Sequence, residues 1–488
     1  MNNQTDNLTI KVHNATKWSA ITNILRKLIT PIINMILARL LTPDIFGVVA
    51  TINVVISFAD LFTDAGFQKY LIQHEFKDDN ELYKFANVAF WTNLVLSIII
   101  WLIIAVYRNN LAALVGSPDY GLHLIISALA IPLLSFSSIQ QAIYKRNFNF
   151  KDLFIPSIIN SVIPLIVTVP IAYFTGSCWS LIIGTLATKL SDAIFLTIKS
   201  KWKPKIYYSL KQLKEMFSFS MWTLFESLSI WLTLNIDIFI LGNLITNYHL
   251  GLYKTSLTSV NQITTIITTT IIPVLFSALS RSQNNDKQFK DTFNSFQKKC
   301  SILLIPMSFG MLIFGDVVTW VLLGSKWKEA TMFISIIGFT QAFTILFSNF
   351  ASEVYRAKGN PKISFIIQII FIIIMTPIIV VGAMKSFNFL CIAKVITIFI
   401  FFIMHVIVLK FKYKFKISTM ISNIKIPLLA SLIMSIFAIL LHSLTTSYTV
   451  KLLMIIACII IYFSTCMISK EFRSNIINYS KKYSKNKI

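Results

Sequence analysis

Apolar runs of about twenty residues alternate with short polar or basic segments along almost the whole chain. A helix of about twenty apolar residues is long enough to cross a lipid bilayer, so the pattern predicts an all-α polytopic membrane protein. We expect about fourteen transmembrane helices, at 18–41, 44–67, 85–107, 122–144, 152–174, 178–198, 217–241, 250–279, 301–323, 330–353, 363–383, 388–409, 426–444 and 452–468.

One stretch, ARLLTPDIFGVVA at 38–50, returns in altered form about two hundred residues later. Thr42 and Gly47 line up with Thr246 and Gly251 at the same spacing, and later landmarks repeat at nearly that spacing, namely Gly116-Ser117 with Gly324-Ser325, and Tyr144-Lys145-Arg146 with Tyr355-Arg356. Two halves of similar plan in a membrane are typical of transporters. We therefore predict two pseudo-symmetric six-helix lobes followed by two C-terminal helices.

This repeat and the basic segments set the expected domain boundaries. They are a cytoplasmic tail at 1–17, an N-lobe at 18–198, a basic cytoplasmic linker at 199–216, a C-lobe at 217–409, a basic cytoplasmic loop at 410–425, the last two helices at 426–468 and a basic cytoplasmic tail at 469–488. The polar, charged segment 280–300 has phenylalanines at helical spacing, which predicts an amphipathic helix lying on the inner membrane surface.

Composition agrees with a membrane protein. The 488 residues are 55% hydrophobic and 13% charged, against about 25% charged residues in soluble domains, and the mean hydropathy is +0.71. The net charge of +24 would suggest a nucleic-acid partner in a soluble protein. Here the basic residues flank the helices, so they indicate topology and no nucleic acid.

The basic residues are concentrated on one side of the predicted helices. With the N-terminus inside, only five of the 44 lysines and arginines fall in outer loops, namely Arg108, Lys326, Lys328, Lys385 and Lys451. Cytoplasmic loops of membrane proteins carry the excess of positive charge. The sequence therefore predicts that both termini are cytoplasmic, and that the basic loops contact membrane lipid.

Charged residues inside the predicted helices are the candidate site. Arg26 belongs to a polar stripe on the first helix, with Thr22, Asn23, Thr30 and Asn34 at spacings of three or four residues. Such a stripe is costly against lipid and favours a water-filled cavity. The candidate cavity cations are Arg26, Lys27, Arg39 and Lys254. They would bind an anionic group such as a phosphate, for which the planar guanidinium is well suited.

Embedded acids accompany these cations. Asp60, Asp64, Glu226 and Asp237 are the candidates. They could pair with Arg26 or Lys27 between helices, or couple transport to a coupling ion, H+ or Na+. Lys189 and Asp192, three residues apart, are expected to form a local ion pair.

Signatures of enzymes are absent from the sequence. The six histidines and five cysteines are scattered without metal-ligand spacing, and no phosphate loop, nucleotide-binding glycine motif or nucleophile elbow occurs. We expect no catalytic residue, no metal and no cofactor.

The ARLLTPDIFGVVA stretch resembles the signature of the polysaccharide transporter family, the flippases for O-antigen and capsule repeat units. Three further stretches are similar to that family's pattern, namely NIDIFILGNLITNYHLGLY, GSKWKEA and YKRNFNFKDL. The family belongs to the multidrug, oligosaccharidyl-lipid and polysaccharide exporter superfamily. The likeness covers the chain from about Trp18 to beyond Leu409.

The resemblance implies a flippase of the bacterial inner membrane. It would move undecaprenyl-diphosphate-linked oligosaccharide repeat units of O-antigen, lipopolysaccharide, capsule or exopolysaccharide from the cytoplasmic to the outer leaflet by alternating access. A polysaccharide polymerase and chain-length proteins would be its partners. No family motif assigns Arg26 or Lys27 a role, so their role is inferred from the residues themselves.

Three alternatives stay open. A cation-coupled multidrug exporter of the same superfamily would have acids without cavity cations, so Arg26 and Lys27 count against it. A membrane polymerase or ligase of the same pathway would carry a large outer loop, whereas the predicted outer loops are short. A scaffolding partner would have little use for embedded charges.

Overall fold

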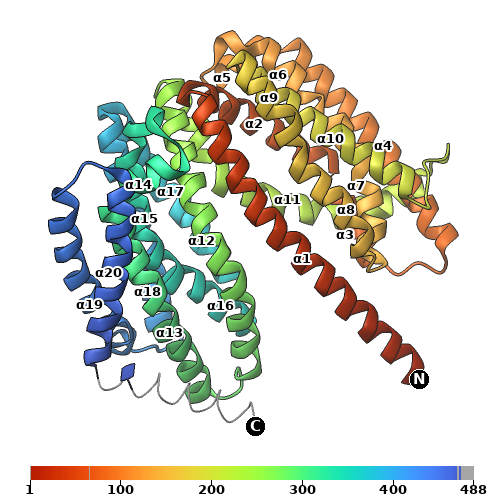
Figure 1. Cartoon of the computed structure of the whole chain (residues 1–488). Helices are drawn as coiled ribbons and strands as arrows, with labels where there is room; N and C mark the ends of the chain where they lie inside the picture. Colours follow the sequence, from red (N-terminus) through yellow and green to blue (C-terminus); the bar gives the residue numbers. More distant parts are fainter. Residues whose placement is uncertain (1, 65, 470–471, 474–488) are drawn as a thin grey trace. The chain divides into compact units, whose positions relative to one another are not determined.

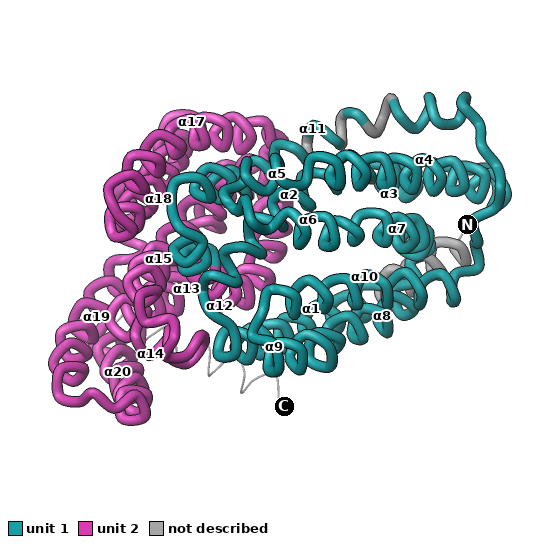
Figure 2. Tube along the Cα trace, turned by 90° about the horizontal axis from the view of Figure 1, so that it is seen from above, with its two compact units in different colours: residues 1–254 teal, residues 255–488 magenta. Residues whose placement is uncertain are grey.

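The computed structural model describes residues 2–64, 66–469 and 472–473, without the side chains of 2–13, 64, 218–220, 222–223 and 226. Its regular structure in these residues is entirely helical (Figure 1). The contacts divide the chain into two compact units, Met1–Lys254 (unit 1) and Thr255–Ile488 (unit 2), coloured separately in Figure 2. The prediction of an all-α membrane protein is confirmed.

Unit 1 holds the first eleven α-helices and the first turns of the twelfth. They are α1 (Asn2–Leu40), α2 (Pro43–Asp64), α3 (Phe67–Gln73), α4 (Asp79–Val106), α5 (Arg108–Leu114), η1 (Pro118–Tyr120), α6 (Gly121–Ala128), α7 (Ala130–Arg146), α8 (Phe150–Ile163), η2 (Pro164–Thr168), α9 (Val169–Thr175), α10 (Trp179–Lys199), α11 (Leu210–Leu241) and the start of α12 (Asn247–Arg281).

The helices of unit 2 complete the chain. They are the rest of α12, then α13 (Asp286–Ile313), α14 (Gly315–Leu322), η3 (Ser325–Ala330), α15 (Thr331–Phe343), η4 (Thr344–Asn349), α16 (Phe350–Ala357), α17 (Lys362–Lys385), α18 (Phe387–Phe411), α19 (Ile417–Ser443) and α20 (Tyr448–Ile468).

Thirteen helices in the described part of the chain are long and apolar enough to cross a membrane. They correspond to thirteen of the fourteen predicted spans. The other prediction, 217–241, falls within α11, a helix of 32 residues in which the described side chains form an apolar segment at Ser227–Leu241. The protein is therefore a multi-pass membrane protein, and the count of about fourteen is approximate.

The packing of α11 decides the division into units. α11 packs against α2, α3 and α4, so its contacts group it with the first six predicted spans. The expected linker at 199–216 rests on the internal repeat and the basic residues, and the division into lobes stays a prediction.

The amphipathic segment is not a separate surface helix. It forms the first half of α13, which continues without interruption to Ile313. Phe289 and Phe293 are fully buried, and Phe293 packs edge-on against Phe350 and Phe415. The prediction was wrong because helical spacing of phenylalanines reveals an apolar face but not what covers it, and here neighbouring helices cover it.

The two copies of the repeated stretch meet inside unit 1. A Cβ atom added to Gly47 would lie 1.9 Å from the Asn247 carbonyl oxygen, and one added to Gly251 would lie 1.8 Å from the Pro43 carbonyl oxygen. Asn247 stands in the second copy where Pro43 stands in the first. The contact is therefore reciprocal, as expected between two elements related by a two-fold axis.

In each unit a basic side chain near the end of a helix donates to backbone carbonyl oxygens and lies over a phenylalanine ring. Arg146 donates to the carbonyl oxygens of Leu71 and His74, and its guanidinium lies 4.7 Å from the Phe76 ring centroid. In unit 2, Lys358 donates to the Gln283 carbonyl at 2.7 Å and lies 4.6 Å from the Phe289 centroid. The same local arrangement recurs in both units.

Candidate functional site

The polar stripe of α1 lines a cavity of about 450 Å³ inside unit 1. Ser19, Thr22, Asn23 and Arg26 form this wall, because their spacing of three or four residues places them on one face of the helix. We call this space the cationic cavity. The polar face of α1 predicted from the sequence lines it at Thr22, Asn23 and Arg26.

The other walls of the cationic cavity come from α7, α8 and α10, which pack against one another. They add two further cations, Lys145 on α7 and Lys189 on α10. Arg26, Lys145 and Lys189 make no side-chain hydrogen bond or ion pair with the described residues. Three cations without such partners around one polar cavity favour an anionic ligand.

Asp192 is the carboxylate of this cavity, and two amides hold it. Gln141 donates to Asp192 Oδ2 at 2.9 Å, and Asn160 donates to Asp192 Oδ1 at 2.9 Å. Within the described residues Asp192 forms no ion pair with Lys189, so the prediction of a local pair was wrong. Amides from α7 and α8 donate one hydrogen bond to each carboxylate oxygen instead, which sequence spacing along α10 could not reveal.

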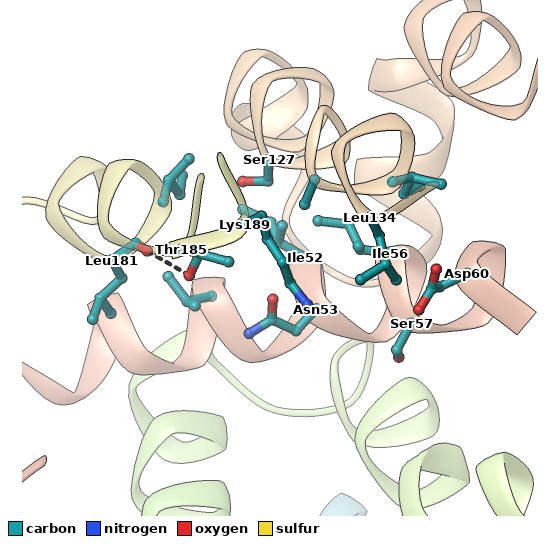
Figure 3. Close-up of a pocket in the computed structure, with 14 residues that line it drawn as sticks. Ile52, Asn53, Ile56, Ser57, Asp60, Ser127, Leu134, Leu181, Thr185 and Lys189 are labelled. Atoms are coloured by element: carbon teal, nitrogen blue, oxygen red, sulfur yellow. Dashed lines mark hydrogen bonds between the residues drawn. The ribbon is translucent and has the colours of Figure 1, made fainter. Parts of the chain in front are cut away.

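A second, mostly apolar cavity of about 240 Å³ adjoins this site (Figure 3). α2 contributes Asn53, Ser57 and Asp60, and Asp60 accepts a hydrogen bond from Thr63 at 3.1 Å. Lys189 lines both cavities, and its side chain extends toward Asn53 in Figure 3. The cation at Lys189 therefore lies between the candidate anion site and the candidate acid Asp60.

The remaining predicted cations line neither cavity. Lys27 neighbours Arg26 on α1 but lies off the cavity wall. Arg39 donates to the Met35 carbonyl at 3.2 Å in the last turn of its own helix, where a cation is favoured by the helix dipole. Lys254 lies on α12, away from both linings.

The remaining predicted acids have other surroundings. Asp237 is buried, accepts a hydrogen bond from the Tyr253 hydroxyl at 2.5 Å, and so joins α11 to α12. The side chains of Asp64 and Glu226 lie outside the described residues.

Lys145 and Lys189 are the cations that the sequence did not assign to the site. Lys145 lies just beyond the predicted span 122–144, and Lys189 is assigned to a local pair. A usable signal was present, because Lys145 lies one helical turn after the polar Gln141. That α7 and α10 both line the same cavity as Arg26 depends on the tertiary structure and could not be predicted from the sequence of either helix.

Comparison with known proteins agrees with this architecture. The sequence model of a family described as "Polysaccharide biosynthesis protein" matches residues 36–332. The succinoglycan biosynthesis transport protein ExoT of Rhizobium meliloti is 22% identical over 368 residues, which cover 74% of each chain.

Two solved structures share the fold. Lipid II flippase MurJ in an inward closed conformation matches with a TM-score of 0.71 and 17% identity, covering 94% of this chain and 99% of that chain. An inward-facing multidrug resistance transporter of the MATE family matches with a TM-score of 0.63 and 12% identity, covering 82% and 98%. Because the family match spans more than half of the 488 residues, this chain belongs to the polysaccharide biosynthesis protein family.

Proposed function

We propose that this protein is a flippase that carries undecaprenyl-diphosphate-linked oligosaccharide repeat units from the cytoplasmic to the outer leaflet of the bacterial inner membrane. The observation that carries the proposal is the cationic cavity, where Arg26, Lys145 and Lys189 face one space without ion-pair partners among the described residues. The diphosphate is the anion that these cations would bind. Family membership and the names of its relatives support the same function.

The proposed mechanism places the cationic cavity within the membrane. The lipid tail stays in the bilayer while the diphosphate and sugars occupy the cavity, which opens to each side in turn. Its energy source is a coupling ion, H+ or Na+, and Asp60 is the acid that best fits this role because Lys189 connects its cavity to the anion site. Both termini are cytoplasmic, and the polymerase and chain-length proteins act after it.

Two neighbouring residues of α1 provide the test. Arg26→Ala should abolish glycan export at normal protein abundance, since it removes the bidentate phosphate donor. Lys27→Ala is the matched control and should keep export, because Lys27 lines neither cavity. Normal export by the Arg26→Ala protein would contradict the phosphate-binding role.

The function itself is tested in a strain that lacks the gene. Undecaprenyl-diphosphate oligosaccharide should accumulate on the cytoplasmic leaflet and disappear when the wild-type gene returns. Single repeat units on the outer leaflet would place the block after translocation and favour a polymerase. No lipid-linked sugar on either leaflet would favour the drug exporter, for which the apolar cavity beside Asp60 would be the candidate site.

A further inference from the structure

Three side chains that line the cationic cavity are hydrogen-bonded to one another, and the proposed phosphate binding does not involve them. Asp192 on α10 accepts one amide hydrogen bond from Gln141 on α7 and one from Asn160 on α8. We call these three residues the amide–carboxylate triad. A carboxylate offers about four lone-pair positions, so about two remain for a ligand.

The chemistry of Asp192 fixes how both amides are turned. An ionised carboxylate only accepts hydrogen bonds, so each amide must direct its NH₂ group toward Asp192 and its oxygen away from it. Asn160 Oδ1 is buried and has no hydrogen-bond partner among the described residues. It has almost no accessible surface and so does not face the cavity, which leaves the remaining lone pairs of Asp192 as the acceptors open to a ligand. The triad therefore favours a ligand with hydroxyl or N–H donors.

The triad lies one helical turn from the cations. Lys145 follows Gln141 by four residues on α7, and Lys189 precedes Asp192 by three on α10. Side chains so spaced on a helix lie about 5–6 Å apart at Cβ. A phosphate bound by the lysines would thus have its directly attached group beside the triad.

Charge sets the direction of the bound molecule. The negative charge of Asp192 repels a phosphate, whereas it strengthens hydrogen bonds from uncharged hydroxyl groups. The phosphates would therefore face Arg26, Lys145 and Lys189, and the uncharged part would face the triad. The cavity volume of about 450 Å³ lies within the range typical of small-molecule sites.

We propose that the amide–carboxylate triad binds the hydroxyl groups of the sugar attached directly to the diphosphate, and so selects which sugar the protein accepts. This inference rests on the proposed function and adds the residues that recognise the sugar. Gln141 and Asn160 act as positioning residues for Asp192.

The test compares two lipids on the purified full chain in lipid nanodiscs. One is the lipid-linked oligosaccharide that accumulates in the strain lacking the gene, and the other is undecaprenyl diphosphate without sugar. Asp192→Asn should weaken binding of the glycolipid by about tenfold, because it loses charge-assisted hydrogen bonds. It should leave binding of the bare diphosphate unchanged or tighter. Lys189→Gln is the comparison variant and should weaken both lipids.

The ratio of the two affinities separates recognition from a merely structural role. Equal weakening of both lipids by Asp192→Asn, or no change in either, would overturn the inference. If that variant does not fold, Asn160→Ala gives the same ratio test with the Asp192 charge retained. A wild-type protein that binds both lipids equally would refute sugar recognition and leave the diphosphate role intact. A wild-type protein that binds neither would refute the proposed function itself.

Discussion

Asp316 on α14 joins two other side chains at one end of unit 2. Lys451 Nζ donates to its Oδ2 at 2.6 Å, and His442 Nε2 lies 3.1 Å from both of its oxygens. Burial alone would raise the pKa of Asp316, but the hydrogen bonds from Lys451 and His442 outweigh it and lower the pKa below 3.8. Since the Lys451 side chain is only 8% exposed, losing this carboxylate would leave a buried cation without its ion-pair partner, although His442 Nε2 stays 3.0 Å away.

We expect Asp316→Asn to lower the free energy of unfolding by about 2 kcal/mol at neutral pH, because it removes hydrogen bonds between charged groups. A carboxylate whose pKa is lowered on folding stabilises the protein above its unfolded pKa. That contribution is lost as the pH falls through the lowered value. The difference in melting temperature between wild type and variant should therefore be full at pH 7 and shrink below about pH 3.8. The exposed Glu329→Gln variant is the control, and a pH-independent difference for Asp316→Asn would contradict the expectation.

Individual residues of the site could be predicted from the sequence only where their spacing along a single helix places them on one face. The helical spacing of Thr22, Asn23 and Arg26 was sufficient to predict a polar wall, and these three residues line the cavity. Lys189 was misassigned because its own helix offers Asp192, whereas Gln141 and Asn160 from two other helices take that carboxylate. Tertiary packing determines which side chain reaches Asp192, and the spacing of residues along one helix carries no information about that packing.

At the scale of elements, the first turns of α2 and α12 approach as closely as backbones allow. Gly47 and Gly251 are the residues that permit it, since each lies against a carbonyl of the opposite copy. Small residues at such crossings let helix backbones pack closely in membranes. The sequence revealed the repeat through these glycines, but it did not reveal that the two copies touch.

Gly251→Ala should lower the melting temperature of the purified protein, because its methyl group would need the space of the Pro43 carbonyl. Overpacking of this kind typically costs about 1–3 kcal/mol. Gly310→Ala on α13 is the matched control, since no atom beyond the neighbouring residues and backbone of its own helix lies within 4 Å of the added carbon. Alanine is also the better helix former, so the control should be as stable as wild type or more so. Equal melting temperatures for wild type and Gly251→Ala would argue against the close crossing.

At the scale of the whole molecule, the hydropathy pattern was enough to predict the helical membrane fold. The predicted span 217–241 falls within α11, a helix of 32 residues. Whether α11 crosses the bilayer determines the topology of the rest of the chain, because every later loop would lie on the opposite side of the membrane if it did not. The distribution of lysine and arginine favours crossing.

Cysteine labelling tests this arrangement. The five native cysteines are buried, and they can be replaced before single cysteines are added at Lys201, Asn284 and Asn110. If α11 crosses the membrane, a membrane-impermeant maleimide added to whole cells should label only Asn110→Cys. Lys201→Cys and Asn284→Cys should react only after permeabilisation. Labelling of Asn284→Cys in intact cells would mean that α11 does not cross.

The reciprocal contact of Gly47 with Gly251 also bears on how such a chain evolves. In a half-length ancestor that formed a symmetric dimer, one codon would have encoded the glycine on both sides of this contact. A single mutation would then have placed a larger side chain at both positions. Gene duplication separates the two codons. Each side can then change alone, and a larger residue on one side can be offset by a shift on the other. In this chain positions 47 and 251 are both glycine, whereas Pro43 and Asn247, which occupy equivalent positions and lie against those glycines, differ.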